Sequence, residues 1–219
     1  MVALHLAALI APPTRRPTYG EALALCRDLA RTHYENFPLV SWLVPRALRP
    51  HVTALYAYCR TVDDVGDEAP GDREGLLDRF EGELSLAYRG EARHPVLVAL
   101  EPTIDRFELP QEPLWKLIQA NRIDQTKHRY ATFAELLEYC DHSANPVGRL
   151  FLHLFGLSRF YGFRLFENYY LFRSISNRQV ADSNGDSAWN SLDRGNKSQL
   201  LSAYRQGAYA HRCWHVPKP

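Results

Sequence analysis

Three aspartates lie close together in the first third of the chain, at positions Asp63, Asp64 and Asp67. On a helix, the spacing of four places the carboxylates of Asp63 and Asp67 on one face, about 6 Å apart, where they repel each other. Such a pair suits Mg²⁺, which prefers oxygen ligands and is held by one or two carboxylates together with phosphate oxygens of a substrate. A solvated acidic helix end is the other interpretation, although acid at a helix C-terminus opposes the helix dipole.

Arg60 and Tyr56 precede these aspartates by one and two helical turns respectively, on the same predicted face. An arginine beside a carboxylate pair can clamp a metal-bound diphosphate through bidentate hydrogen bonds. The alternative is an ion pair between Arg60 and Asp64 at spacing i,i+4, worth about 0.3–0.5 kcal/mol on a surface. The residues alone leave both interpretations open.

Two later clusters also carry polar groups. Asp124 stands near the end of a predicted helix, shortly before Arg129 and Tyr130. Residues 139–150 read YCDHSANPVGRL, in which small residues, a proline and a glycine interrupt an apolar helix. Such an interruption can leave backbone carbonyls unpaired for a ligand, or it can be a packing kink.

Helices are the elements that must position these clusters. Capping boxes of Thr18 with Glu21 and of Thr132 with Glu135 open two of them, and nothing in the chain alternates with period two. Pro146 should kink the last helix, because proline lacks an amide hydrogen and clashes with the preceding turn. The chain is therefore predicted to be all-α, with helices over about 18–34, 52–68, 72–90, 95–107, 113–124 and 132–155.

Length and charge exclude several classes of protein. The chain has 219 residues, enough for one domain with a full core, and 26 basic against 25 acidic residues give a net charge of +1. A general nucleic-acid binder would carry a clear basic excess, so no nucleic-acid partner is expected. The four cysteines form no Cys-x-x-Cys pair, which disfavours a zinc site and a disulfide framework.

The two ends of the chain differ from its middle. The apolar run 4–11 is too short to span a membrane and has no basic residues before it, so we expect residues 1–18 to be flexible. From residue 158 the composition changes: residues 1–157 carry a net charge of −4 and the remainder +5, with 8 of the 11 serines. We therefore expect a helical domain over residues 19–157 and an atypical tail over 158–219, the product of a frameshift, a mistaken gene model or a fused unrelated sequence.

Together the clusters resemble a known family. Residues 56–68 read YAYCRTVDDVGDE and are similar to the first aspartate-rich motif of the squalene and phytoene synthases. Residues 143–150, SANPVGRL, with Asp124, Arg129 and the stretch 33–38, HYENFP, resemble the hydroxysqualene synthase branch of bacterial hopanoid biosynthesis. The resemblance covers roughly residues 19–157 and implies an isoprenoid-synthase-like helical bundle around a central apolar cavity, incomplete at its C-terminal end.

The resemblance also implies roles for individual residues. Asp63 and Asp67 would hold Mg²⁺ on a prenyl diphosphate with Asp64 in an auxiliary role, and Arg60 would contact the diphosphate. Tyr139 would lie near the reacting carbons, where a phenol can steer a proton or favour a carbocation through its π face. The other residues implied to bind substrate are Phe37, Tyr56, Asp124, Arg129 and Asn145.

The second aspartate-rich motif of the family is not recognisable in this chain. Asp182 and Asp186 have the required spacing, but Asn177 precedes Asp182 by five residues where a helical site needs four, and residues 183–185 indicate a turn. Asp182 and Asp186 are therefore weak candidates for metal ligands. Without this motif half of the metal site is missing, which leaves open whether the chain is an enzyme.

The function implied by the resemblance is the Mg²⁺-dependent conversion of presqualene diphosphate to hydroxysqualene. Squalene or phytoene synthesis from two prenyl diphosphates, such as farnesyl diphosphate, is the alternative within the family. From another class, a non-catalytic relative could act as a binding or assembly scaffold. We expect a cytoplasmic protein whose apolar substrate and product are compatible with peripheral contact with the inner membrane and with partner enzymes of hopanoid synthesis.

Overall fold

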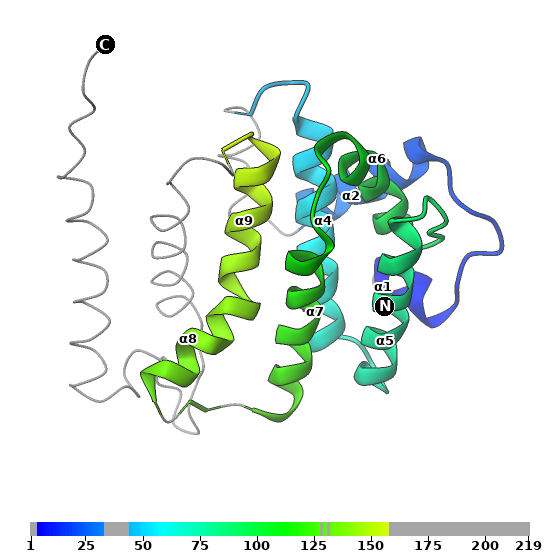
Figure 1. The fold of residues 1–219 in the computed structure, drawn as a ribbon. Helices are drawn as coiled ribbons and strands as arrows, with labels where there is room; N and C mark the ends of the chain where they lie inside the picture. The colour runs from blue at the N-terminus through cyan, green and yellow to red at the C-terminus, as the bar shows by residue number, and fades with distance from the viewer. Residues whose placement is uncertain (1–3, 33–43, 128, 131, 158–219) are drawn as a thin grey trace, which may run out of the picture. The chain divides into compact units, whose positions relative to one another are not determined.

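The computed structural model describes residues 4–32, 44–127, 129–130 and 132–157. These residues form helices and contain no strand, which confirms the all-α prediction. None of the helices described is both long and apolar enough to cross a bilayer. The helices are α1 (Leu4–Ile10), α2 (Tyr19–Thr32), α4 (Arg49–Asp67), α5 (Arg73–Ala87), α6 (Pro95–Phe107), α7 (Gln111–Thr126), α8 (Phe133–His142) and α9 (Ala144–Leu154) (Figure 1).

The chain divides into two compact units, Met1–Gln125 and Thr126–Pro219. The division falls at the end of α7, whereas we expected one helical domain over residues 19–157. Helices α1 to α7 belong to the first unit, and α8 and α9 belong to the second.

Local capping signals determine where two of the helices begin. At α2 the amide of Thr18 donates to Oε2 of Glu21 at 2.8 Å, and the amide of Glu21 donates to Oγ1 of Thr18 at 3.4 Å. At α8 the hydroxyl oxygen of Thr132 accepts from the amide of Glu135 at 3.2 Å. These side chains pair amide groups that have no partner within the first helical turn, so both predicted helix starts are confirmed.

Helix α4 is the element around which the first unit is built. It packs against α1, α2, α5 and α6 (Figure 1). Tyr58 of α4 is fully buried, stacks on Phe80 of α5 at 5.4 Å between ring centroids, and donates its hydroxyl to the carbonyl of Leu114 in α7 at 2.7 Å. A buried phenol needs such a partner, so this hydrogen bond helps to fix α4 against α7.

The beginning of the chain differs from the flexible segment that we expected. Residues 4–10 form α1, in which His5, Leu6 and Leu9 are buried. The imidazole of His94 contacts the carbonyl of His5 at 2.9 Å, and the guanidinium of Arg79 donates to the carbonyl of Leu9 at 3.3 Å. The apolar run is thus a short helix that buries one side against α4, α5 and α6 of the same unit.

The predicted kink at Pro146 is instead a break between two helices. Helix α8 ends before Ser143, whose φ of −103° and ψ of −69° separate it from α9. Pro146 is the third residue of α9, in the first turn, where the missing amide hydrogen removes no intrahelical hydrogen bond. The interruption predicted within residues 139–150 is present, but it lies at Ser143, three residues before Pro146.

Candidate active site

The last turns of α4 separate the three aspartates. Asp63 and Asp67 are exposed, whereas Asp64 is 1% exposed and the adjoining Val65 and Gly66 are buried. Because residues three and four apart share a helix face, Asp63 and Asp67 lie together on the solvent side. The helix continues to Asp67, and the amide of Glu68 donates to the carbonyl of Asp64 at its end.

Asp63 is held by a residue of another helix. The amide Nδ2 of Asn121, in α7, donates to Oδ1 of Asp63 at 3.3 Å and also contacts the carbonyl of Leu117 at 3.2 Å. Asn121 is 4% exposed and lies against Gly66, where an added Cβ would come within 2.2 Å of its Oδ1. Nearby, Gln125 donates to the carbonyl of Gly66 at 3.0 Å. The absence of a side chain at Gly66 therefore lets α7 approach closely enough for Asn121 to reach Asp63.

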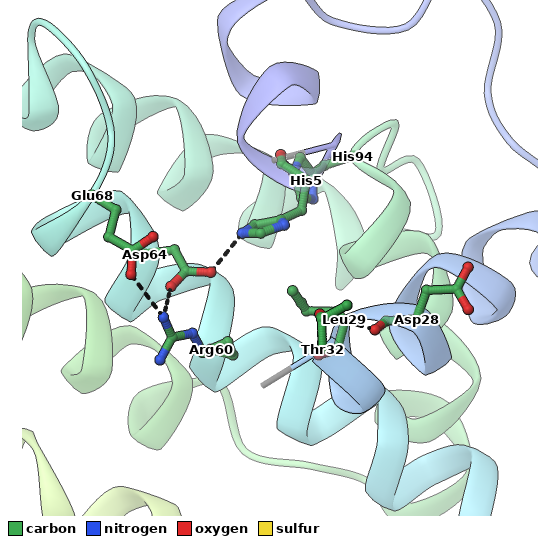
Figure 2. Close-up of polar contacts among 8 residues, drawn as sticks. All are labelled: His5, Asp28, Leu29, Thr32, Arg60, Asp64, Glu68 and His94. Carbon is green, nitrogen blue, oxygen red and sulfur yellow. Dashed lines mark hydrogen bonds and ion pairs between the residues drawn. The ribbon is translucent and has the colours of Figure 1, made fainter. Parts of the chain in front are cut away.

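Asp64 is enclosed by two basic side chains (Figure 2). Its Oδ2 lies 2.7 Å from Nε2 of His5, and its Oδ1 lies 2.5 Å from Nη2 of Arg60. Burial alone would raise the pKa of this carboxyl, but the hydrogen bond from His5 and the charge of Arg60 outweigh it and hold the pKa below the ordinary value. Asp64 is therefore a buried carboxylate whose two oxygens face His5 and Arg60.

Arg60 connects this buried carboxylate with the surface. It also pairs with Glu68 at 3.0 Å, and its side chain is 30% exposed. The ion pair between Arg60 and Asp64, left open by the sequence, is therefore present. This ion pair fixes one side of the planar guanidinium of Arg60, which has five hydrogen-bond donors. The exposed part of the Arg60 side chain lies on the same helix as Asp63 and Asp67.

The donor set on α4 fits Mg²⁺ better than a metal that needs a closed cage of protein ligands. Among the residues described, no group of three or more His, Cys, Asp or Glu side chains could hold a metal ion. Asp63 and Asp67 are two exposed carboxylates one turn apart, which matches an ion that keeps its remaining positions for water and substrate phosphate. Asp64 fits less well, because both of its oxygens already face basic groups.

Two more predicted residues belong to the first unit. Tyr56 is half-buried on α4, one turn before Arg60, and burial raises the pKa of its phenol, which keeps it protonated at neutral pH. Asp124 is half-buried on α7, three residues after Asn121. Both interact with other groups in the structure. The first unit therefore contains Tyr56, Arg60, the three aspartates of α4 and Asp124.

Three predicted residues belong to the second unit. Tyr139 on α8 is 5% exposed, and its ring centroid lies 5.1 Å from that of Tyr130. Arg129 is exposed, between α7 and α8. Asn145 on α9 is half-buried, and its Oδ1 is buried with no hydrogen-bond partner among the described residues. Phe37, Asp182 and Asp186 lie outside the described residues, so their assigned roles stay predictions.

Sequence reasoning missed His5 and Asn121, two residues whose side chains contact aspartate carboxylates of α4 from other helices. Each had a detectable signal. His5 is the only polar residue in the apolar run 4–11, and Asn121 lies at a buried position of α7. A polar residue on a buried helix face needs a partner, but the sequence does not say which one.

Comparison with known proteins places these features in context. The model of the squalene/phytoene synthase family matches residues 30–183. A phytoene synthase from Arthrospira platensis is 34% identical over 148 residues, which are 66% of this chain and 48% of that protein. A hydroxysqualene synthase from Sinorhizobium fredii is 37% identical over 135 residues, which are 60% of this chain and 45% of that protein.

A solved structure supports the same relationship. The crystal structure of squalene synthase HpnC from Alicyclobacillus acidocaldarius matches with a TM-score of 0.69 and 46% sequence identity, covering 78% of this chain and 64% of that one. The chain spans about half the length of the curated relatives described above. The segment matched by the family model includes α4, and the matched segments cover less than half of the two curated relatives.

Proposed function

The chain belongs to the squalene/phytoene synthase family, and from this premise we propose that it converts presqualene diphosphate to hydroxysqualene with release of diphosphate. The observation that carries the proposal is the exposed pair Asp63 and Asp67 beside Arg60 on one helix, within the matched segment. Similarity to a hydroxysqualene synthase and to squalene synthase HpnC favours this reaction.

In this proposal the α4 residues bind the leaving group. Asp63 and Asp67 hold Mg²⁺, which when bound neutralises charge on the departing diphosphate. Arg60 donates hydrogen bonds to diphosphate oxygens, with its guanidinium held on the other side by Asp64. Breaking the C–O bond transfers its electron pair to the diphosphate, and these groups stabilise the charge that develops there.

The aromatic residues act on the hydrocarbon part of the substrate. The carbocation left by ionisation rearranges, water adds to it, and loss of one proton gives hydroxysqualene. Tyr139 offers a phenol and a π face near the reacting carbons, and Tyr56 and Phe37 line the apolar cavity predicted for the bundle. Asp124, Arg129 and Asn145 bind substrate polar groups. Asp182 and Asp186 stay weak candidates for a second metal site.

Two other functions remain as alternatives. Similarity to the Arthrospira platensis phytoene synthase favours condensation of two prenyl diphosphates by the same α4 residues. The limited coverage of the relatives favours a non-catalytic protein that binds a prenyl diphosphate or a partner enzyme. A cytoplasmic location with peripheral membrane contact stays a prediction that rests on the apolar substrate and product.

A direct assay separates these functions. The purified chain is incubated with presqualene diphosphate and Mg²⁺, with farnesyl diphosphate in a parallel reaction, and the products are identified by mass spectrometry. Hydroxysqualene from the first reaction, lost in an Asp63→Ala, Asp67→Ala double variant, is the expected result. A C30 condensation product of two farnesyl diphosphates would favour the first alternative, and a folded chain without turnover would favour the scaffold.

A further inference from the structure

A series of polar contacts, buried at one end, links α1 to the surface of α4. It runs from His5 through Asp64 to Arg60 and Glu68, with distances of 2.7, 2.5 and 3.0 Å between successive partners (Figure 2). The side chains of His5 and Asp64 are 3% and 2% exposed, and that of Arg60 is 30% exposed. The series of contacts therefore begins in the interior and ends at the exposed Glu68, the C-cap residue of α4, which directly follows Asp67.

His5 is itself held firmly in place. Its backbone carbonyl contacts Nε2 of His94, which is 1% exposed and packs edge-on against Phe80. Leu6 and Leu9 bury the same helix. The imidazole of His5 thus reaches Asp64 from a fixed position.

A buried carboxylate depends strongly on its hydrogen-bond donors. Loss of one donor leaves its oxygen desolvated and unpaired, which is unfavourable enough to change the carboxylate's orientation. Because the other oxygen of Asp64 pairs with Arg60, such a change moves the guanidinium as well. Helix α1 precedes the segment that matches the family model, which begins at residue 30.

We propose that His5 is a positioning residue, which fixes Asp64 and through it orients Arg60 for binding a diphosphate. This inference rests on the proposed function, because it assigns Arg60 to the diphosphate of a prenyl substrate. It makes α1 a functional part of the site although α1 lies outside the matched segment. It also makes Asp64 a support for Arg60, in contrast to the two exposed aspartates.

The test compares three variants of the full chain. His5→Leu fills the buried position with an apolar side chain and removes the donor to Asp64. His5→Gln replaces the imidazole with an amide NH₂ group, which can still donate to Asp64 and should therefore restore binding. Leu9→Ala is the matched control, because it weakens the burial of the same helix and leaves the hydrogen bond from His5 to Asp64 in place. Circular dichroism and thermal unfolding establish that each variant is folded.

The first readout is binding of inorganic pyrophosphate in the presence of Mg²⁺, measured by calorimetry. We expect His5→Leu to raise the Kd about tenfold, the range typical for residues that orient a ligand-binding group, and the other two variants to stay within about twofold of the parent chain. Equal losses in His5→Leu and Leu9→Ala, or no loss in either, would overturn the proposal.

The second readout needs no ligand. Phenylglyoxal modifies accessible guanidinium groups, and peptide mass spectrometry gives its rate at Arg60, with the 78% exposed side chain of Arg31 as internal reference. We expect at least a threefold change in the Arg60 rate in His5→Leu alone. If the parent chain does not bind pyrophosphate, the diphosphate part of the proposed function fails, and an unchanged Arg60 rate separately refutes the positioning role of His5.

Discussion

Asn121 of α7 donates a hydrogen bond to Asp63 of α4 at 3.3 Å across a contact that the glycine at position 66 makes possible. The exposed carboxylate proposed to bind Mg²⁺ is therefore oriented by a buried amide from another helix. Groups that orient metal ligands typically affect metal affinity by 10–100-fold, although they never touch the metal.

Asn121→Leu should weaken Mg²⁺-dependent binding of pyrophosphate about tenfold, because Asp63 loses the donor that orients it. Calorimetric titration measures the change. Gln125→Ala is the control. Its side chain donates to the backbone carbonyls of Gly66 and Asn121 in the same contact, whereas the hydrogen bond to Asp63 comes from Asn121. An Asn121→Leu variant that binds as the control does would show that the hydrogen bond has no part in binding.

Gly66→Ala should lower the free energy of unfolding by about 1–3 kcal/mol, because the new Cβ would collide with the side chain of Asn121. Gly82→Ala in α5 is the matched substitution. Apart from the adjacent residues and the backbone of its own helix, no atom lies within 4 Å of the new Cβ, so the higher helix propensity of alanine should stabilise the chain by about 0.5–1 kcal/mol. Urea denaturation measures both, and the same sign for the two variants would contradict the packing argument.

The three aspartates should respond differently to removal of charge. Asp64→Ala should lower the free energy of unfolding by about 3 kcal/mol or more, because Arg60 and His5 lose their buried partner. Asp63→Ala and Asp67→Ala should leave stability nearly unchanged, since both residues are exposed, but should abolish Mg²⁺-dependent pyrophosphate binding. Calorimetry and urea denaturation of the three variants give both quantities, and equal destabilisation by all three would disprove this division.

Stability should fall as the pH is lowered because of His94. Burial disfavours its charged form and lowers its pKa from 6.5 to about 4, with the nearby imidazole of His5 acting in the same direction and the hydrogen bond to the His5 carbonyl opposing it. Between these values the unfolded chain binds a proton that the folded chain does not, so the free energy of unfolding decreases as the pH falls from 6.5 to 4. The full effect is about 3 kcal/mol.

His94→Gln isolates this effect, because glutamine does not titrate and its amide can still donate to the carbonyl of His5. Urea denaturation at pH 7 and pH 4.5 should show a larger loss of stability for the parent chain than for the variant. Glu83, which accepts from the backbone amide of His94, is present in both proteins and cancels in the comparison. Parallel pH dependences would mean that His94 is not kept neutral by burial.

Sequence alone determined the local features of this protein. The capping boxes at Thr18 and Thr132, and the i,i+4 spacing of Asp63 and Asp67, follow from contacts within one or two helical turns. The positions of neighbouring residues on a helix depend on a fixed geometry, so these features could be predicted before the structure. The motif at residues 56–68 likewise identified the family, which the comparisons confirm.

Only the tertiary structure decided which of the three aspartates is buried and which residues of other helices contact Asp64 and Asp63. Asp64 meets His5 across 59 positions of sequence, and Asp63 meets Asn121 across 58. The interruption was predicted at Pro146 instead of Ser143 for a related reason. Proline is tolerated in a first helical turn, and the sequence did not show where that turn began. Contacts between distant segments depend on how helices pack, and packing is determined by the whole set of buried surfaces rather than by any local pattern.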